Sequence, residues 1–590
     1  MSGNSIPDGH FDKLIESFRK DNFDVDENEG VFQFDGKVGI VATHKTAINS
    51  NNKKKKKAYY VEGSHYQMGY LMGLMAEQEI AIMTTDFIKN IVFDFVHLDM
   101  KDELRKIIGE FLLDIVISLA KNIEQDIPEE YKEEMRGILD GCKEANPNTK
   151  VEYGNLFVLN VGIDALLSVV YTGKFPKPKM KKLTKDVKDL LKTKIKLTPR
   201  IKSKPNEHLR IPIMCNGFSI FGEATGGNSH FMGRDFMFPT ADVFQDVACL
   251  TIYNSDENEL PIVSMTAPGF VGSIAAMNTR GVSCGVDMGP SGSCDPDRPG
   301  MNSLLLVRNS IVHGDSCEAA VDVMVNTQRG VSWIYVLADG TNDRSCIVEA
   351  GKSTGNIDYL KYPPLYLRIL GLLPTRRFIE QHATLQPQNG LMVRWNDYEY
   401  PVEYISKYNK RLWKFYKPII SFLKNHKIQI YPDAFDENGY IDKSKSDENC
   451  PYSYYFAPQR DKRNDIVLTT NHFIIPEMRL CGMFPWTVFV VQGELDDIQW
   501  RYDELNHEIL SALENGGTID FDKAKSLISF LSPDGKFKKY YNPDNKPLSE
   551  VQVFGSISIL DLKNKIIESL YGYFADEWVR ITLPNYTNEM

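Results

Sequence analysis

The sequence predicts an α+β fold in which an α-helical region precedes a region rich in β-strands. Up to about residue 171, apolar residues recur at helical spacing and helix-capping signals stand before them. After Cys215, apolar and polar residues alternate, and glycine-containing turns separate the runs. A lysine-rich segment with several prolines lies between the two regions. We therefore divide the 590 residues into a polar segment, a helical region, a basic linker and a strand-rich domain: 1–57, 58–173, 174–214 and 215–590.

Helices are expected in four stretches of the first part. The first, "SHYQMGYLMGLMAEQEIAIM", opens with Ser64 and has Gln67 three places later, which is a capping-box arrangement. Before it, the polar segment ends in "NSNNKKKKK", which is most simply a solvated loop. The other helices are expected at Lys101–Asn122, Pro128–Ala145 and Tyr153–Tyr171.

The basic linker has an unusual charge. Lys174–Arg210 holds 14 lysines and arginines against 3 acidic residues, a net charge of +11. Its four prolines and few large apolar residues predict an exposed connector, and contact with an acidic surface or a membrane is the alternative. The chain as a whole carries −11, which argues against general nucleic-acid binding.

Strands are expected throughout the last part. Asn216–Phe221 alternates, Gly226-Gly227 supplies a turn, and Phe231 begins the return strand. Ser316 or Asp315 caps a helix in "DSCEAAVDVMVNTQ". Residues 355–465 are rich in Tyr, Pro and Lys and predict no clear element. Further strands are expected in "GSIAAMNTRGVSCGVDM", "VSWIYVLADGTNDRSCIVEA", "DIVLTTNHF" and "SEVQVFGSISILDLKNKIIESLYG".

Several protein classes are disfavoured. The start of the chain lacks a basic region followed by an apolar run, so a secretory signal is not expected. No stretch approaches 18 consecutive apolar residues, so no membrane span is expected either. Nine cysteines without a CxxC pair indicate neither a disulfide framework nor a structural zinc site. We therefore expect a cytoplasmic protein.

Cys215 is the candidate nucleophile, because it begins a strand directly after the exposed linker. A thiol reacts only when a base removes its proton. His208 and His230 are near in sequence, but neither placement is diagnostic of a catalytic pair. Cleavage of the chain just before the cysteine is another solution, because the freed α-amine has a pKa of about 7.7–8.0 and is itself a base.

The segment "CNGFSIFGEATGGNSHFMGRDFMF" resembles the Cys, hairpin and Gly-Arg-(Asn/Asp) signature of N-terminal-nucleophile (Ntn) hydrolases. It is most similar to the acyl-coenzyme A:6-aminopenicillanic acid acyltransferase, or C45 peptidase-like, family. Four more stretches resemble that family in the same order, so the resemblance covers roughly residues 60–510. They are "VEGSHYQMGYLMG", "AAMNTRGVSCGVDM", "CEAAVDVMVNTQRGVSWIYVLADG" and "LTTNHF".

The resemblance implies a four-layer αββα sandwich over residues 215–590, preceded by the helical region as a smaller subunit. It implies self-cleavage between Met214 and Cys215, with the two fragments remaining associated. Cys215 would then be the nucleophile through its sulfur and the base through its α-amine. Arg234 and Asp235 would orient the nucleophile, and Asn471 would donate to the oxyanion.

The sequence departs from the family pattern at two positions. The family often has an acid three residues after the arginine, where this chain has Met237, and a glycine before the nucleophile, where it has Met214. Two of the site residues also have a structural alternative: Arg234 as an ion-pair partner and Asn471 as a turn residue. The other cysteines considered, His472 and Asn278 are interpreted as structural; these cysteines are Cys249, Cys284, Cys294, Cys317, Cys346 and Cys481.

The predicted function is that of a self-processing cysteine hydrolase or acyltransferase acting on a linear, non-peptide amide through an acyl-thioester on Cys215. The resemblance leaves acyl-CoA open as a donor and implies no metal or organic cofactor. Residues 355–465 are predicted to shape the substrate pocket, with a packing or oligomer surface as the alternative. Two other functions stay open: a phospholipase-B-like lipid hydrolase and a non-catalytic binding protein on the same scaffold.

Overall fold

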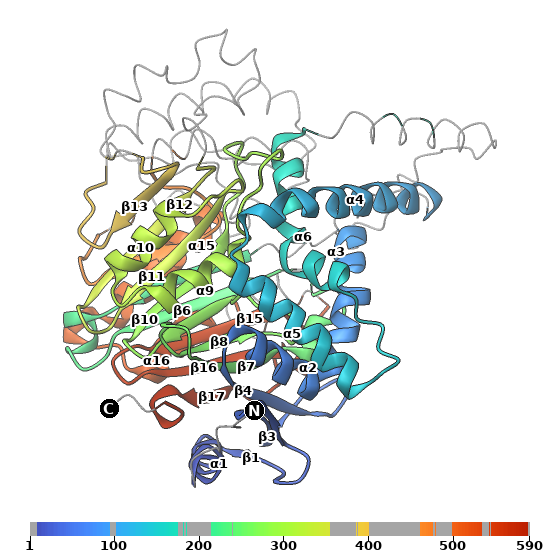
Figure 1. Ribbon diagram of the computed structural model, residues 1–590. Coiled ribbons are helices and arrows are strands. Elements are labelled where there is room, and N and C mark those ends of the chain that lie inside the picture. The colour runs from blue at the N-terminus through green and yellow to red at the C-terminus, as the bar shows by residue number, and fades with distance from the viewer. Residues whose placement is uncertain are drawn as a thin grey trace.

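The computed structural model is mixed α/β, with two β-sheets and helices packed on them (Figure 1). Most of the linker 174–214 and of the insertion 355–465 lies outside the described residues. The structure describes residues 9–94, 102–174, 214–238, 240–353, 387–400, 461–475, 498–533 and 544–587, with a few single positions between these ranges.

Sheet A is the larger sheet and contains strands from both sides of Cys215. The pairing is antiparallel throughout, except that β4 runs parallel to β7, with Ala58 opposite Leu250 and Gly63 opposite Ser255. The strand order is β1 (Phe23–Asp24), β3 (Lys37–Ile48), β4 (Lys55–Gly63), β7 (Cys249–Ser255), β8 (Ile262–Thr266), β9 (Ala275–Asn278), β10 (Val282–Met288), β11 (Trp333–Asp339), β12 (Arg344–Ala350) and β13 (Leu391–Trp395), and β2 (Val31–Phe34) pairs with β3.

Sheet B carries the predicted nucleophile. Strand β5 lies inside the sheet, between β14 and β6, so both of its edges are paired. The turn before β6 places Gly226 and Gly227 at φ of 63° and 78°, a conformation that favours glycine. The strand order is β14 (Ile466–Thr469), β5 (Met214–Ile220), β6 (Phe231–Met237), β15 (Gln552–Asp561), β16 (Ile566–Tyr573) and β17 (Val579–Thr582).

The two sheets face each other across an apolar core. A Cβ added at Gly217 of β5 would lie 2.7 Å from Val336 Cγ2 of β11, so glycine at this position permits the close approach. The helices α9 (Ser303–His313) and α10 (Cys317–Asn326) pack on sheet A, and α15 (Ile498–Ala512) and α16 (Phe521–Ile528) pack on sheet B.

Helices α2 to α6, which precede Cys215, form a group beside sheet A (Figure 1). Helices α2 and α5 are in backbone contact: a Cβ at Gly69 would collide with the carbonyl of Glu134, and one at Gly137 with the carbonyl of Tyr66. Small residues four apart on both helices therefore allow this packing. The elements are α2 (His65–Ile82), a π-helical turn (Met83–Phe87), α3 (Ile88–Asp94), α4 (Asp102–Ile123), α5 (Glu129–Ala145) and α6 (Tyr153–Thr172).

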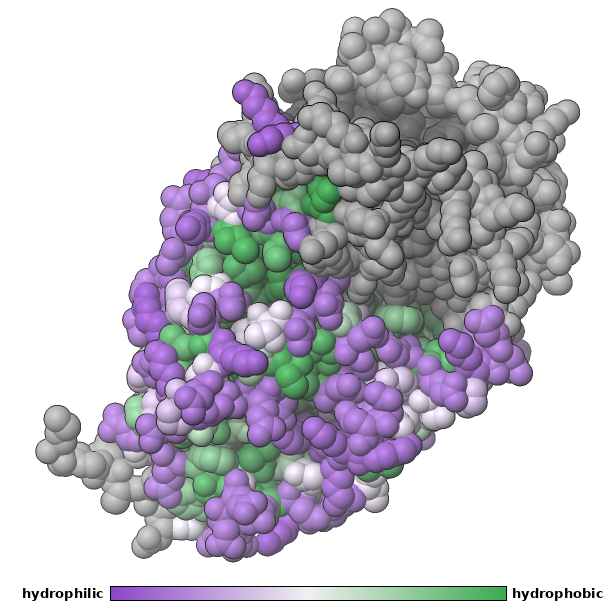
Figure 2. Space-filling model, turned by 90° about the vertical axis from the view of Figure 1, so that its right-hand side faces the viewer, coloured by the Kyte–Doolittle hydropathy of each residue, from purple (hydrophilic) through white to green (hydrophobic). Residues whose placement is uncertain are grey.

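Helix α6 is, among the described residues, the one helix long and apolar enough to cross a membrane by length and composition alone. Of its most apolar window, 67% is buried inside the protein, which is the pattern of a core helix. On the side shown in Figure 2, hydrophilic residues interrupt the hydrophobic ones wherever the surface is coloured. Three large hydrophobic side chains are exposed in the described part of the chain: Ile48, Ile82 and Ile117.

A buried ionic cluster joins α2 and α5 to elements that follow Cys215. The His65 ring contacts Glu134 at 2.6 Å and Glu259 at 3.1 Å, and Arg308 of α9 contacts Glu134 at 2.7 Å. All four side chains are almost fully buried. A buried charge is costly unless it is paired. The cluster therefore needs both the part of the chain before Cys215 and the part after it to be folded together.

Most of the local predictions are confirmed. Ser64 and Gln67 form the capping box, Ser316 caps α10, and each predicted hairpin or strand is present. Asn278 is the expected turn residue, since its Oδ1 accepts from the backbone N–H groups of Arg280 and Val282. The predicted helices of the first part correspond to α2, α4, α5 and α6.

The expectation for the polar segment was wrong. Residues 9–57 include α1 (His10–Lys20) and strands of sheet A, and the lysine run enters β4 instead of forming a solvated loop. Lys56 is 5% exposed; its Nζ lies 3.4 Å from Asp576 and donates to the Tyr571 carbonyl at 2.6 Å. The strand tolerates these lysines because the buried ammonium group, that of Lys56, is paired with Asp576.

Candidate active site

Cys215 is the second residue of β5, and its side chain is fully buried. Its cross-strand partner on β6 is Phe236, and its Sγ lies 3.7 Å from the carbonyl oxygen of Met237. Burial raises the pKa of the Cys215 thiol above its usual value, and the nearby Arg234 guanidinium acts in the opposite direction. Among the described residues, no histidine hydrogen-bonds to the thiol.

Asn471 holds the main-chain nitrogen of Cys215. It follows β14, the neighbour of β5, and its Oδ1 accepts from the Cys215 N–H at 2.8 Å. Its Nδ2 donates to the carbonyl of Met288 at 2.9 Å. Since donors surround Oδ1 and an acceptor faces Nδ2, this network fixes the orientation of the amide.

The loop that carries Asn471 is anchored from sheet A. The Glu349 carboxylate on β12 accepts from the backbone N–H groups of Ile474 and Ile475, at 2.8 and 3.1 Å. It also pairs with Arg394 at 2.9 Å, so this buried charge is neutralised. The loop that carries Asn471 is therefore held in a fixed position relative to β5.

Arg501 of helix α15 completes the network around Cys215. Its Nη1 donates to the carbonyl of Cys215 at 3.0 Å and to Asn216 Oδ1 at 2.8 Å, and its Nη2 donates to Asn471 Oδ1 at 3.1 Å. The side chain is fully buried. A guanidinium in this position links the backbone of Cys215, the side chain of Asn216 and the amide of Asn471.

Arg234 and Asp235 occupy different sides of β6. Arg234 reaches from sheet B to Asp287 of β10 in sheet A, with Nη1 2.6 Å from Oδ1. Gly285 leaves room for this side chain, because a Cβ there would lie 2.9 Å from Arg234 Cδ. Asp235 instead accepts from Asn216 Nδ2 at 3.2 Å. Burial raises the pKa of both carboxyls, Asp235 and Asp287, to about 7, and Arg234 opposes the rise.

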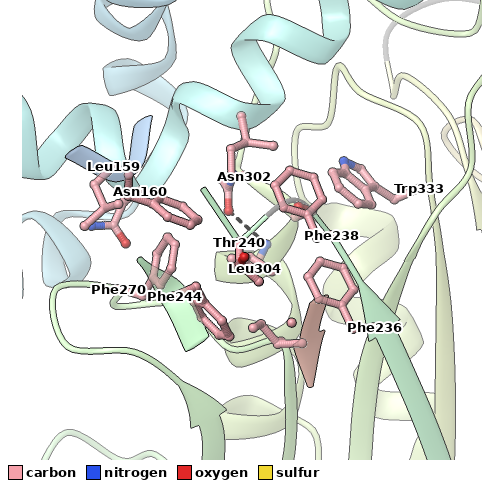
Figure 3. A pocket seen from close by; sticks show the side chains of 15 residues that line it. Leu159, Asn160, Phe236, Phe238, Thr240, Phe244, Phe270, Asn302, Leu304 and Trp333 are labelled. Carbon is pink, nitrogen blue, oxygen red and sulfur yellow. Dashed lines mark hydrogen bonds between the residues drawn. The ribbon is translucent and has the colours of Figure 1, made fainter. Parts of the chain in front are cut away.

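An apolar pocket with a cavity volume of about 30 Å³ opens beside Phe236 (Figure 3). The side chains of Phe236, Phe238, Phe244, Phe270 and Trp333 surround the same space. The remaining lining residues are Phe87, Leu159, Asn160, Ile163, Thr240, Ile274, Asn302, Ser303, Leu304 and Gly555. The predicted contribution of residues 355–465 to the pocket lies largely outside the described residues.

The structure brings the four predicted site residues, Cys215, Asn471, Arg234 and Asp235, to one region around β5. The sequence reasoning missed Arg501 and Asn216, and it left Asp287 unassigned. The alternation of β5 points Asn216 to the opposite face from Cys215 and was readable in advance, whereas no local pattern marks Arg501. Within the described residues, no group of three or more side chains suits a metal ion.

The structure also places the histidine and most of the cysteines that the sequence analysis interpreted as structural. His472 contacts Thr470 Oγ1 at 2.9 Å. Of the cysteines assigned a structural role, Cys481 lies outside the described residues, and the others are buried and free of disulfides: Cys249, Cys284, Cys294, Cys317 and Cys346.

No protein-family model matches the chain. An uncharacterized protein of Archaeoglobus fulgidus is 28% identical over 519 residues, which is 88% of this chain and 64% of that protein. The chain thus spans less than two thirds of the length of this relative.

Two solved structures of mutant conjugated bile acid hydrolase from Clostridium perfringens are similar in fold, with TM-scores of 0.29 and identities of 11% and 10%. Each alignment covers 64% of this chain and 95% of the bile acid hydrolase chain.

Proposed function

We propose that the protein is a self-processing cysteine hydrolase or acyltransferase of the Ntn type, acting on a linear, non-peptide amide. One observation carries the proposal: a hydrogen-bond acceptor, Asn471 Oδ1, is aimed at the main-chain nitrogen of a buried cysteine. That cysteine has no histidine partner among the described residues. If the chain is cut between Met214 and Cys215, this nitrogen becomes an α-amine that is already held beside its own thiol.

The chemistry follows from that arrangement. The α-amine, with an ordinary pKa of about 7.7–8.0, takes the thiol proton. The thiolate adds to the acyl carbonyl, and the ammonium then gives its proton to the leaving nitrogen as the C–N bond breaks. Water or a second amine attacks the acyl-thioester, releases the acyl group and restores the thiol. Each proton moves between groups within this site or the solvent, so the cycle needs no further reactant.

The surrounding residues have distinct roles in this proposal. Asn471 Oδ1 orients the amine, while the second hydrogen on its Nδ2 is free to serve the oxyanion. Arg501 fixes the Cys215 carbonyl and the same amide. Arg234, paired with Asp287, keeps a positive charge near the thiolate as it forms.

Two further features support an Ntn-type αββα arrangement. Helices pack on sheet A, sheet A packs on sheet B, and other helices pack on sheet B. The five family-like stretches also occur in the expected order. A cytoplasmic location and acyl-CoA as a donor remain parts of the proposal that rest on the sequence.

Mass spectrometry of the purified chain tests the proposal. We expect two fragments, residues 1–214 and 215–590, and an intact chain for Cys215→Ala. Incubation with acyl-amides, acyl-CoA and phospholipids then identifies the class of substrate. An active wild-type enzyme that consists only of the intact chain would overturn the assignment of the base. Release of product from phospholipid alone would replace the amide by a lipid ester.

A further inference from the structure

We propose that Glu349 and Arg394, a buried ion pair on sheet A, are positioning residues that hold Asn471 in place beside Cys215. The inference rests on the proposed function, because it needs Asn471 to donate to the oxyanion. Neither Glu349 nor Arg394 lies in a stretch that resembles the Ntn family. The pair therefore adds residues on which kcat depends although they lie outside the site itself.

The two side chains are diagonal neighbours on the face of sheet A that points toward sheet B. Glu349 of β12 lies opposite Met392 of β13, and Arg394 follows Met392 by two residues, so both side chains point to the same side. Ser345 precedes Glu349 by four residues and lies on that face too, where its Oγ contacts Ser219 Oγ of β5 at 2.7 Å. The pair thus faces the sheet that carries the predicted nucleophile.

The pair forms hydrogen bonds with the chain on both sides of Asn471. Arg394 Nη2 donates to the carbonyl of Leu468 at 3.5 Å, three residues before Asn471. Glu349 accepts from the backbone N–H groups of residues 474 and 475, at 2.8 Å through Oε1 and at 3.1 Å through Oε2. Arg394 Nε joins these contacts by donating to Glu349 Oε1 at 2.9 Å. The segment that carries Asn471 is therefore fixed at both ends by one ion pair.

The same segment also packs on helix α15. The ring of His472, next to Asn471, lies edge-on to the ring of Tyr502, with the ring centroids 5.5 Å apart. Tyr502 follows Arg501, which donates to Asn471 Oδ1 at 3.1 Å. A shift of this segment would thus move the amide relative to both Cys215 and Arg501.

Geometry explains a buried ion pair at this place better than stability does. Glu349 and Arg394 are 0% and 1% exposed, and the desolvation cost of such a pair commonly offsets its attraction. A carboxylate, however, accepts on two oxygens at once, which the two N–H groups and the guanidinium here require. A glutamine would instead turn an NH₂ group toward one of these donors.

The amide of Asn471 is sensitive to displacement, because an oxyanion donor acts only at hydrogen-bond distance from the developing charge. A misplacement of about 1 Å can cost about 10²-fold in rate. In Glu349→Gln, kcat per cleaved chain should therefore fall by about 10- to 100-fold on an acyl-amide, with KM nearly unchanged. If this variant does not fold or is not cleaved, Arg394→Lys replaces it, and loss of the contact to Leu468 should lower kcat by about 3- to 10-fold.

Glu134→Gln is the matched control, because Glu134 is also buried and pairs with an arginine, Arg308, at 2.7 Å. It should lower stability in urea without lowering kcat. The double variant Glu349→Gln/Arg394→Met removes both charges, so it should be at least as stable as either single variant and still have the low kcat. Recovery of kcat together with stability in the double variant would show a merely structural role and overturn the inference.

Combination with Asn471→Asp tests whether Glu349 acts through the amide. Asn471→Asp lacks the oxyanion donor, so adding Glu349→Gln should lower its kcat by about threefold at most. A further loss of about tenfold or more in this background, or an unchanged kcat in Glu349→Gln alone, would overturn the inference. Cleavage and Cys215 alkylation of the wild type would still support the proposed function in that case. A wild type that shows no cleavage and no turnover of any amide would overturn the proposed function and this inference with it.

Discussion

Two replacements of Asn471 separate the two roles that its amide has in the proposed mechanism. Asn471→Asp keeps an acceptor for the Cys215 N–H and for Arg501, but places an oxygen where Nδ2 now donates to Met288. Asn471→Ala removes the acceptor and the donor together. Orientation of the Cys215 nitrogen should therefore survive in the first variant and fail in the second.

The structure sets the expected size of each effect. Loss of the acceptor leaves the buried Cys215 N–H without a partner, which costs about 1–3 kcal/mol, and it removes a charged hydrogen bond from Arg501 worth about 1.5–3 kcal/mol. Asn471→Ala should thus lower the unfolding free energy by roughly 3–5 kcal/mol. Loss of the oxyanion donor should lower kcat by about 10²–10³ in both variants, with KM nearly unchanged.

The assay combines the mass of the chain, kcat and KM on an acyl-amide, alkylation of Cys215 by iodoacetamide, and urea unfolding. We expect Asn471→Asp to be cleaved and alkylated normally while its kcat falls. Asn278→Ala is the matched control, because Asn278 is an equally buried amide with similar hydrogen bonds in the β9–β10 turn. It should lose stability without losing kcat. Full kcat in Asn471→Asp refutes the oxyanion role, and normal cleavage and kcat in Asn471→Ala refute both roles.

Three more predictions concern groups outside this amide. Gly285→Ala should displace the Arg234 side chain and cost about 1–3 kcal/mol in urea unfolding, whereas Gly154→Ala, where a Cβ meets nothing within 4 Å, should cost nothing. Burial would lower the pKa of His65, but the hydrogen bonds that its ring donates to the Glu134 and Glu259 carboxylates raise it to about 9. The resulting stability, about 3 kcal/mol, is fully present below pH 6.5 and is lost as the pH rises to 9, so His65→Gln should flatten that part of the pH profile of unfolding and an unchanged profile would contradict the assignment. Asp164→Asn should keep its hydrogen bonds after rotation of the Ser303 hydroxyl, while Asp164→Ala should lose about 2–5 kcal/mol in urea unfolding; equal stability of the two variants would contradict this reading of the hydrogen bonds.

The features that could be predicted from the sequence are those whose signals are local. Ser64 with Gln67 marks a helix start within four residues, and Gly226-Gly227 marks a hairpin in two. Strand β4 could not be found in this way, since its lysines mask the alternation and its parallel partner β7 begins at Cys249. Arg501 was missed for a related reason: its position arises from the packing of α15 against β5, which leaves no motif in the sequence around it.

The long-range pairing of β4 also bears on what self-cleavage would do. The bond between Met214 and Cys215 joins two parts that share sheet A, because β4 pairs with β7 from Ala58 to Gly63. Lys56 is paired with Asp576 in the same core, and the His65 cluster adds contacts on the helical side. A cut at Met214 removes one covalent link and none of these contacts. We therefore expect the fragments to separate only when sheet A itself unfolds, so a cut enzyme and an uncut Cys215→Ala chain should elute together in gel filtration and differ only under denaturing conditions.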